Sequence, residues 1–457
     1  MRRFIGDKKF YKSLMLVVIP ILLQMFITQF VSLLDNLMVG QVGGSEMTGV
    51  SLANQLLFIF NIAVFGCMSS ASIFGSQYFG AKDKGGYQES FRFKWLLALI
   101  VIIVSTFLFV FFDDELISFF IKNNEDQTID PVVALDSAKS YLMIMLIGNV
   151  PFVIKEIYST SLREMKETFI PMLSGIIAII VNLVFNYLLI FGKFGFPEMG
   201  IEGAAIATVM SRFVEMFIVV IYAYAKIKKF DYFNGAFKDK LRISSVKKFV
   251  PKTIVMLTNE VLWSTGLTLI LSCYAIRGLD TVAAMNISTT VSNLFWTIGT
   301  SVGNGTAIIL GAKLGAKLLD EAKSDSYKIL GFAFVTSILF ALIMFGTAYF
   351  VPNMYKVDDG IRDLAKLFII IVAVIIPFHT VDCCMYFILR TGGKVFITFL
   401  FDSFFVMAIK LPIVFVLVKY TSMGIVPIFI LVNLLDAFKA IPGYILVNNG
   451  VWLKVIV

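Results

Sequence analysis

The chain has 457 residues, of which 58% are hydrophobic and 15% charged, with a mean hydropathy of +0.88 and a net charge of +8. Water-soluble globular proteins of this length do not have such a composition, so we predict a membrane protein. The basic excess does not indicate nucleic-acid binding. It lies mainly in short segments between apolar runs, where it acts as a topology signal.

Apolar runs long enough to cross a bilayer recur along the whole sequence. We predict an all-α polytopic membrane protein with twelve transmembrane helices. The predicted spans cover residues 13–38, 48–79, 91–112, 134–160, 169–192, 200–225, 249–276, 281–312, 327–350, 364–390, 395–418 and 423–448.

The distribution of Lys and Arg gives the orientation. With both termini cytoplasmic, 27 of these residues fall in inner segments and 8 in outer segments. This asymmetry satisfies the positive-inside rule. The first run has no small-residue cleavage pattern, so we expect it to be retained as a helix rather than removed as a signal peptide. We therefore predict a multi-pass membrane protein with both termini cytoplasmic.

The first run carries two unusual residues, Pro20 and Asp35. Proline removes a backbone donor and bends a helix. A carboxylate at membrane depth costs about 2.5–3.5 kcal/mol on insertion scales, which favours a functional role. Alternatively, Asp35 lies near the outer end and is wetted by lipid headgroups, because Gly40 begins the next loop.

The fifth run contains Asn182 and Asn186, four residues apart and therefore on one helical face. Amides in an apolar helix can hold neighbouring helices together by hydrogen bonds. They can equally present oxygens to a small cation or orient a carboxylate. The sequence leaves both interpretations open.

The two halves of the chain resemble each other. Ser76-Gln-Tyr-Phe-Gly-Ala-Lys82 and Gly311-Ala-Lys-Leu-Gly-Ala-Lys317 close the second and eighth runs, 235 residues apart. Leu-Arg turns at Arg163 and Arg390 form a second matched pair. Six spans per half give a parallel repeat, for which rocking of two lobes around a central cavity provides alternating access. We predict an N-terminal lobe (1–225), a basic cytoplasmic linker (226–248) and a C-terminal lobe (249–457).

The second half offers its own acidic candidates. Glu260 lies in the inner half to middle of the seventh run, where it acts either as a proton carrier or as a structural carboxylate paired with another helix. Asp382 lies in the tenth run, three residues after the lone histidine, His379. Two opposite-charge pairs at i, i+3, Arg212/Glu215 and Asp436/Lys439, are expected to pair internally.

No G-x-x-x-x-G-K-[ST] motif occurs in the sequence, which argues against an ATP-driven pump on this chain. The remaining energy source is an ion gradient, since one charge crossing 100 mV releases about 2.3 kcal/mol. We expect no bound cofactor, with H⁺ or Na⁺ as the coupling ion. The four cysteines lie in or beside apolar runs and are interpreted as buried hydrophobes.

Taken together, these motifs resemble the multidrug and toxic compound extrusion (MATE) family, nearest its bacterial NorM-like branch. The resemblance covers essentially the whole chain. It includes Pro20 and Asp35 followed by Leu37-Met-Val-Gly40-Gln-Val-Gly43, and Asn182-Leu-Val-Phe-Asn186. It also includes Gly200-Ile-Glu-Gly203-Ala-Ala-Ile-Ala-Thr208, which opens the sixth run. The resemblance implies a two-lobe antiporter of the bacterial inner (plasma) membrane that exports amphipathic or cationic compounds in exchange for H⁺ or Na⁺.

Carried over by position, the resemblance implies a first-lobe cation site at Asp35, Asn182, Asn186 and Thr208. It implies Glu260 as the second-lobe carboxylate, with Asp382 as its partner. Many relatives have Asp where this chain has Asn186. The site therefore has one acid fewer, which weakens its attraction for Na⁺.

Two other functions fit the sequence less well than a drug antiporter. A lipid-linked oligosaccharide flippase of the same superfamily would need more cationic residues around its cavity, to meet a pyrophosphate. A membrane-embedded enzyme would need clustered nucleophiles, metal ligands or a soluble domain, whereas this chain has one histidine and short loops. We therefore predict a transporter rather than an enzyme, in contact with lipid and small substrates, and functional as a monomer.

Overall fold

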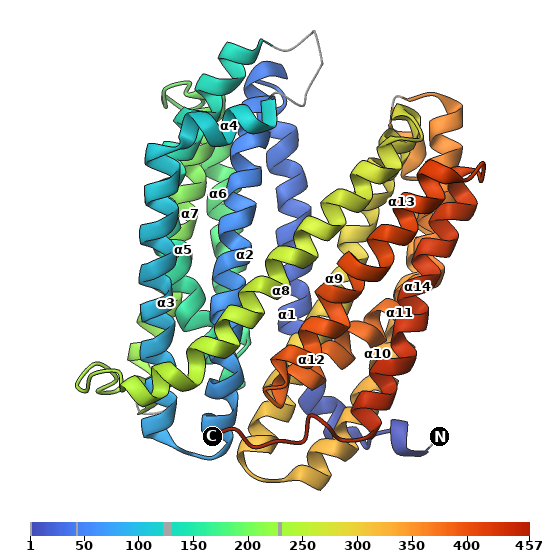
Figure 1. The fold of residues 1–457 in the computed structure, drawn as a ribbon. Coiled ribbons are helices and arrows are strands. Elements are labelled where there is room, and N and C mark those ends of the chain that lie inside the picture. The colour runs from blue at the N-terminus through green and yellow to red at the C-terminus, as the bar shows by residue number, and fades with distance from the viewer. Residues whose placement is uncertain (1, 43, 122–129, 227–230, 356) are drawn as a thin grey trace. The chain divides into compact units, whose positions relative to one another are not determined.

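The computed structural model describes residues 2–42, 44–121, 130–226, 231–355 and 357–457. Lys122 and Lys356, predicted in outer segments, and residues 227–230 of the predicted linker lie outside this part of the chain. The described residues form helices and connecting turns (Figure 1). Helices suit a bilayer, because each satisfies its own backbone hydrogen bonds where no water is present.

The helices follow one another in chain order with short connections. Their bounds are α1 Lys8–Val39, α2 Gly44–Gly80, α3 Lys84–Phe111, α4 Asp113–Ile121, α5 Pro131–Glu164, α6 Phe169–Ile190, α7 Gly200–Ala225, α8 Ile243–Ala275, α9 Leu279–Gly315, α10 Leu319–Thr347, α11 Asp359–Thr391, α12 Val395–Phe399, α13 Leu411–Tyr420 and α14 Ile425–Asn448. Three short 3₁₀ turns cover Arg2–Phe4, Asp231–Phe233 and Pro352–Met354.

Eleven spans among the described residues are long and apolar enough to cross a membrane. The sequence predicts twelve, and the difference is α9, which is long enough but rich in Ser, Thr and Asn. Many of these side chains bond to the backbone of their own helix. For example, Ser292 donates to Ser288 O (2.7 Å) and Thr306 donates to Val302 O (2.7 Å). These bonds lower the cost of placing hydroxyls in an apolar environment.

The span Val395–Tyr420 is not a regular α-helix. Between α12 and α13 the backbone forms two π-helical segments, Leu400–Phe404 and Val406–Lys410. π-Helical turns carry an extra residue per turn and occur frequently at functional sites. They contain Asp402 and Lys410, two charged residues that the sequence places inside an apolar run.

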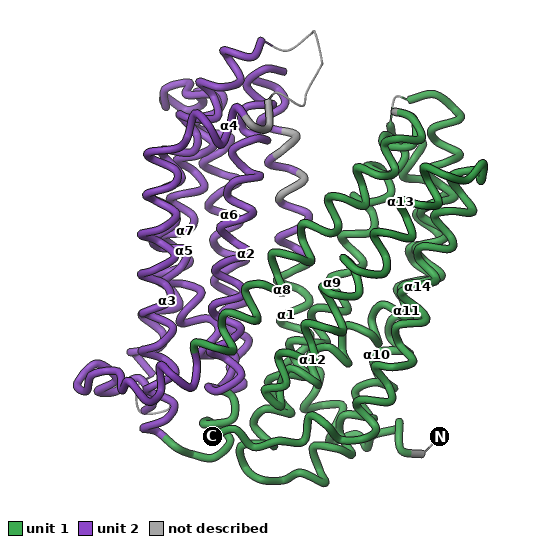
Figure 2. Tube along the Cα trace, viewed as in Figure 1, with its two compact units in different colours: residues 1–25, 76–83, 250–457 green, residues 26–75, 84–249 purple. Residues whose placement is uncertain are grey.

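The chain divides into two compact units that do not follow the midpoint of the sequence (Figure 2). Unit 1 contains residues 1–25, 76–83 and 250–457, and unit 2 contains residues 26–75 and 84–249. The beginning of α1 and the end of α2 therefore belong with the C-terminal helices. In unit 1, Val18 and Met25 contact α9: Gly305 packs against Val18, and Ser301 donates to the sulfur of Met25 (3.3 Å).

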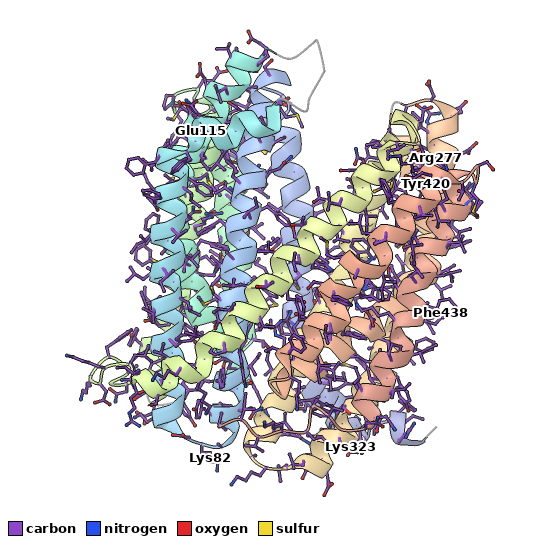
Figure 3. The ribbon with its side chains drawn as sticks, in the orientation of Figure 1. Lys82, Glu115, Arg277, Lys323, Tyr420 and Phe438 are labelled. Atoms are coloured by element: carbon purple, nitrogen blue, oxygen red, sulfur yellow. The ribbon has the colours of Figure 1, made fainter. Side chains whose placement is uncertain are left out.

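The two Gly-Ala-Lys turns have the same backbone structure. Lys82 and Lys317 both adopt positive φ angles, 57° and 61°. The N–H of Lys82 donates to Phe79 O (3.1 Å), and the N–H of Lys317 donates to Leu314 O (2.9 Å). Lys82 lies at the tip of the turn that follows α2 (Figure 3). The sequence repeat therefore corresponds to a repeated helix-terminating turn.

The same two turns also pack against each other inside unit 1. A Cβ atom added to Gly80 would meet the backbone of Ala312, and one added to Gly315 would meet the backbone of Gln77. This reciprocal contact requires glycine at both positions. A cavity of about 530 Å³ lies beside the turns, lined by Gly80, Ala81, Lys82, Asp83, Gly315, Ala316, Lys317, Val455 and Val457.

The basic segment after α7 packs on the N-terminal part of α3, within unit 2. Arg92 donates to the carbonyl oxygens of Asp239 (2.6 Å) and Lys240 (3.3 Å). Phe233 and Phe237 lie against the ring of Phe91, with centroid distances of 5.2 and 5.8 Å. The described part of this segment is therefore fixed to a helix by polar and aromatic contacts.

Candidate functional site

Asp35 lies on α1 where the helix runs through unit 2, and it is half-buried. The Nδ2 atom of Asn186, on α6, donates to its Oδ1 atom at 2.7 Å. Asn186 is 1% exposed, so this bond forms away from bulk water. A short hydrogen bond to a carboxylate in such a place is worth roughly 1.5–3 kcal/mol.

Asn182 extends the network one helical turn away on α6. Its amide nitrogen, oriented toward the carboxylate, lies 3.0 Å from Oδ1 and 3.2 Å from Oδ2 of Asp35. In this orientation its oxygen accepts from the hydroxyl of Thr208, on α7, at 3.2 Å. The opposite orientation places its oxygen against the carboxylate, which suits only a protonated acid. Three helices thus bring together the four residues of the predicted first site.

The donors around Asp35 are neutral. No ion pair to Asp35 occurs among the residues that the structure describes. Two amides stabilise the carboxylate through hydrogen bonds but leave its charge uncompensated. An acid in this state attracts a cation, because opposite charges interact strongly where the local dielectric constant is low.

Glu260 lies on α8 in unit 1 and is surrounded by a second polar network. The hydroxyl of Tyr386, on α11, donates to its Oε1 atom at 3.3 Å. The neighbouring Asn259 donates to the oxygen of Tyr386 (3.2 Å) and to Oδ2 of Asp402 (3.2 Å). Ser403 donates to the backbone oxygen of Asn259 at 3.0 Å. The network therefore joins α8, α11 and the π-helical segments.

Asp382 lies on α11 and is 7% exposed. No hydrogen bond between Asp382 and Glu260 is found in the described ranges, so the two predicted partners are not in direct contact. Instead, the ammonium of Lys439, on α14, lies 2.9 Å from Oδ2 of Asp382 and 3.4 Å from Oδ1 of Asp402. Asp402 then connects through Asn259 and Tyr386 to Glu260.

The expected i, i+3 pairing of charges is wrong at both places. Lys439 pairs with Asp382 and Asp402, whereas Asp436 pairs with Lys410 at 2.7 Å. In unit 2, Glu215 lies 3.6 Å from Lys155, and Arg212 donates to Asn149 at 3.0 Å. Partners on neighbouring helices are preferred in both units because helix packing brings them closer than residues one turn away.

Sequence reasoning missed four members of the second network: Asn259, Tyr386, Ser403 and the bridging role of Lys439. Only two of them carry a signal in the sequence. Asn259 directly precedes Glu260, and Tyr386 follows Asp382 by one helical turn. The position of Ser403 depends on the π-helical backbone, which an apolar run does not reveal.

Pro20, predicted to bend the first helix, lies inside α1, which continues on both sides of it. The residue belongs to unit 1, and α1 passes into unit 2 after Met25. The lone histidine, His379, lies against the ring of Trp296 with a centroid distance of 5.6 Å. Its side chain is partly buried in unit 1.

The chain is similar in sequence to several proteins that are named as probable multidrug resistance proteins. The probable multidrug resistance protein NorM of Thermotoga maritima is 25% identical over 418 residues, covering 91% of this chain and 87% of that protein. The probable multidrug resistance protein NorM of Haemophilus ducreyi is 28% identical over 335 residues, covering 71% and 68%.

Solved structures show the same fold at lower sequence identity. A multidrug resistance MATE family transporter of the MOP superfamily, in an outward-facing conformation, superposes with a TM-score of 0.85 at 17% identity, covering 98% of this chain and 97% of that chain. A mutant of the Vibrio cholerae MATE transporter VcmN gives 0.85 at 16% identity, covering 98% of each chain. The family model MatE matches residues 20–188 and 253–436. The chain therefore belongs to the MatE family of polytopic membrane transporters.

Proposed function

We propose that this chain is a secondary active antiporter that exports small amphipathic or cationic compounds in exchange for H⁺ or Na⁺ by alternating access. The observation that carries the proposal is a half-buried carboxylate, Asp35, that is held by neutral amides and has no ion-pair partner among the described residues. The names of the NorM relatives as multidrug resistance proteins support the same function.

The chemistry of the Asp35 site suits a reversible cation. The amides of Asn182 and Asn186 favour the ionised carboxylate by donating hydrogen bonds. Binding of H⁺ or Na⁺ removes the charge, and the donors then lose their strongest acceptor. The two states therefore favour different arrangements of α1 against α6. This difference couples ion binding to a conformational change, as a population shift requires.

We assign cation coupling to six residues in two networks. Asp35, Asn182, Asn186 and Thr208 form the first network, in unit 2. In the second, in unit 1, Glu260 is the acid that exchanges the ion, and Asp382 acts on it indirectly, through Lys439, Asp402, Asn259 and Tyr386. Pro20 supplies a flexible point in α1, since a proline removes one backbone hydrogen bond from the helix.

The cellular setting forms part of the proposal. The 27 to 8 distribution of Lys and Arg favours cytoplasmic termini in a bacterial inner membrane. Both proposed ion networks lie within one chain, which favours a functional monomer. Single cysteines placed beside Lys323, labelled in Figure 3, and beside Met354 test the orientation. Membrane-impermeant thiol reagents on intact cells should label only the second position.

A lipid-linked oligosaccharide flippase is less well supported. That function requires free cationic groups to bind a pyrophosphate. The interior lysines Lys155, Lys410 and Lys439 are instead engaged by carboxylates, at 2.5, 2.7 and 2.9 Å respectively. The relatives compared above are named for multidrug resistance. Both observations favour drug export.

The test is dye efflux from everted vesicles, driven separately by H⁺ and Na⁺ gradients. We expect Asp35→Asn to lower gradient-driven efflux at least tenfold, because the neutral side chain cannot exchange a cation. Glu260→Gln should also lower it. Glu46→Gln, which neutralises an acid at the start of α2, serves as the matched control and should retain wild-type efflux. Full efflux by both Asp35→Asn and Glu260→Gln would contradict the proposal.

A further inference from the structure

The ammonium of Lys439 lies where a cation would be bound in unit 1. Two carboxylates face it, from Asp382 on α11 (2.9 Å) and from Asp402 in the π-helical segment (3.4 Å). The rings of Phe401 and Phe405 lie 4.6 and 5.7 Å from the same nitrogen. Carboxylates and aromatic faces both attract positive charge. The four groups together form a cage for a single cation.

Most of the cage is shielded from water, and Asp402 is its more exposed carboxylate, with 19% of its side chain accessible. Lys439 is 8% exposed, whereas its neighbour Phe438 is 64% exposed and points away from the bundle (Figure 3). Oδ1 of Asp382 is buried and has no hydrogen-bond partner within the described ranges. A buried carboxylate oxygen without a donor is costly unless a positive charge lies close by. The Lys439 ammonium supplies that charge.

The Asp35 and Asp382 sites differ in the groups that surround the carboxylate. Both sites place an acid on a helix that contains a candidate membrane span, within a polar network. At Asp35 the described donors are neutral amides, so the positive charge must come from solution. At Asp382 a side chain of the same protein supplies it. The two sites therefore differ in where their counter-charge originates.

We propose that Lys439 is a built-in counter-ion that replaces an exchangeable cation in unit 1. The Asp382–Asp402 pair of the native chain then binds no ion from solution. Removal of the Lys439 amine leaves two neighbouring carboxylates without their counter-charge, and these should bind Na⁺. Lys439 thus keeps solvent ions from the Asp382–Asp402 pair and leaves Glu260 as the acid of the second network that exchanges an ion. This inference rests on the proposed antiporter function.

The test measures equilibrium binding of ²²Na⁺ to the purified full-length protein in detergent at pH 8, where protons compete least. We expect Lys439→Gln to gain saturable Na⁺ binding above the wild-type level. The gain should disappear in Lys439→Gln/Asp402→Asn. The matched control is Lys410→Gln, which also removes a lysine from an interior ion pair. Lys410 faces one carboxylate, Asp436, rather than two, so this variant should gain no Na⁺.

Two results would overturn the inference. One is the absence of any added Na⁺ binding in Lys439→Gln that elutes as a folded monodisperse protein. The other is a loss of Na⁺ binding when Asp402→Asn or Asp382→Asn is introduced into the otherwise native chain, because those acids would then already hold a solvent ion. The second measurement does not depend on the folding of any Lys439 variant.

The outcome is separable from that of the proposed function. Na⁺ binding is measured without a gradient and without a transported substrate. If Lys439→Gln gains a Na⁺ site but vesicles show no gradient-driven efflux, the counter-ion inference stands and the antiporter proposal fails. If efflux is coupled but Lys439→Gln gains no Na⁺, only the inference fails.

Discussion

Lys94 and Glu164 form the most deeply buried ion pair among the described residues, with a separation of 2.6 Å and side-chain exposures of 1% and 4%. The ammonium also donates to the hydroxyls of Thr160 (3.1 Å) and Ser161 (2.9 Å). All three of its protons are therefore used. A buried pair contributes little to the free energy of unfolding while both partners are present. Removing one partner lowers that free energy strongly, because the other charge is left buried and unpaired.

We therefore expect Lys94→Met to lower the free energy of unfolding by about 3–5 kcal/mol, because Glu164 is left charged and buried. Lys94→Met/Glu164→Leu should recover most of that loss, since it leaves no buried charge. Thermal unfolding in detergent measures both effects. A double variant as unstable as the single variant would show that the pair itself, rather than an orphaned charge, accounts for the stability.

Individual residues also show what a sequence can reveal. The i, i+4 spacing of Asn182 and Asn186 predicts a shared face, and the structure directs both amides to Asp35. The partners of Lys439 were not predictable, because Asp436 is nearer in sequence than Asp382 or Asp402. Spacing within one helix is visible in a sequence, whereas the register between two helices is not.

At the scale of elements, the close approach of α2 and α9 depends on two glycines. A Cβ on Gly80 would overlap the backbone of Ala312, which cannot move as a flexible side chain can. Overpacking of this kind typically costs about 1–3 kcal/mol. The pattern Gly-Ala-Lys therefore reflects a packing requirement as well as the end of a helix.

Gly80→Ala should accordingly lower the melting temperature in detergent, and Gly315→Ala should do the same. The matched control is Gly346→Ala in α10, where an added Cβ has no neighbour within 4 Å. Alanine there should be neutral or stabilising by up to about 1 kcal/mol, because glycine is a poor helix former. Equal melting temperatures for Gly80→Ala and Gly346→Ala would rule out the close contact.

The π-helical segments could not be predicted from the hydrophobic pattern of the sequence. Residues 395–418 read as one apolar span, and the structure confirms a span there. An extra residue per turn rotates the following side chains about the helix axis, so faces assigned from α-helical spacing are wrong beyond it. Asp402 meets Lys439 from within such a segment.

At the scale of the whole molecule, the segment that joins the two halves of the sequence is held by unit 2. Arg92 carries much of this attachment, because it is 7% exposed and donates to Asp239 O at 2.6 Å. Lys84 adds a more exposed bond to Asp231 (2.6 Å) and holds the pKa of that carboxyl below its usual range. The folded acid is thus ionised at neutral pH.

Arg92→Ala should expose the segment to trypsin, with cleavage after Lys238 and Lys240 at least about tenfold faster, as expected for the loss of roughly 1.5–3 kcal/mol. Lys84→Ala is the control and should have a much smaller effect, since exposed pairs contribute little.

Because the pKa of Asp231 is depressed, the Lys84 bond is fully formed above the ordinary aspartate pKa and weakens only as the pH falls through the lower folded value. Cleavage of the wild type should therefore be equally slow at pH 6 and pH 8.

The assignment of residues 1–25 to unit 1 has a consequence for synthesis in the cell. Val18 and Met25 are made before unit 2, whereas the α9 residues that they contact are made only after all of unit 2. At about 5–20 residues per second, the beginning of α1 waits for tens of seconds without its native neighbours. During that interval lipid or a membrane chaperone must cover it, so biogenesis should be most sensitive to polar substitutions in this first segment.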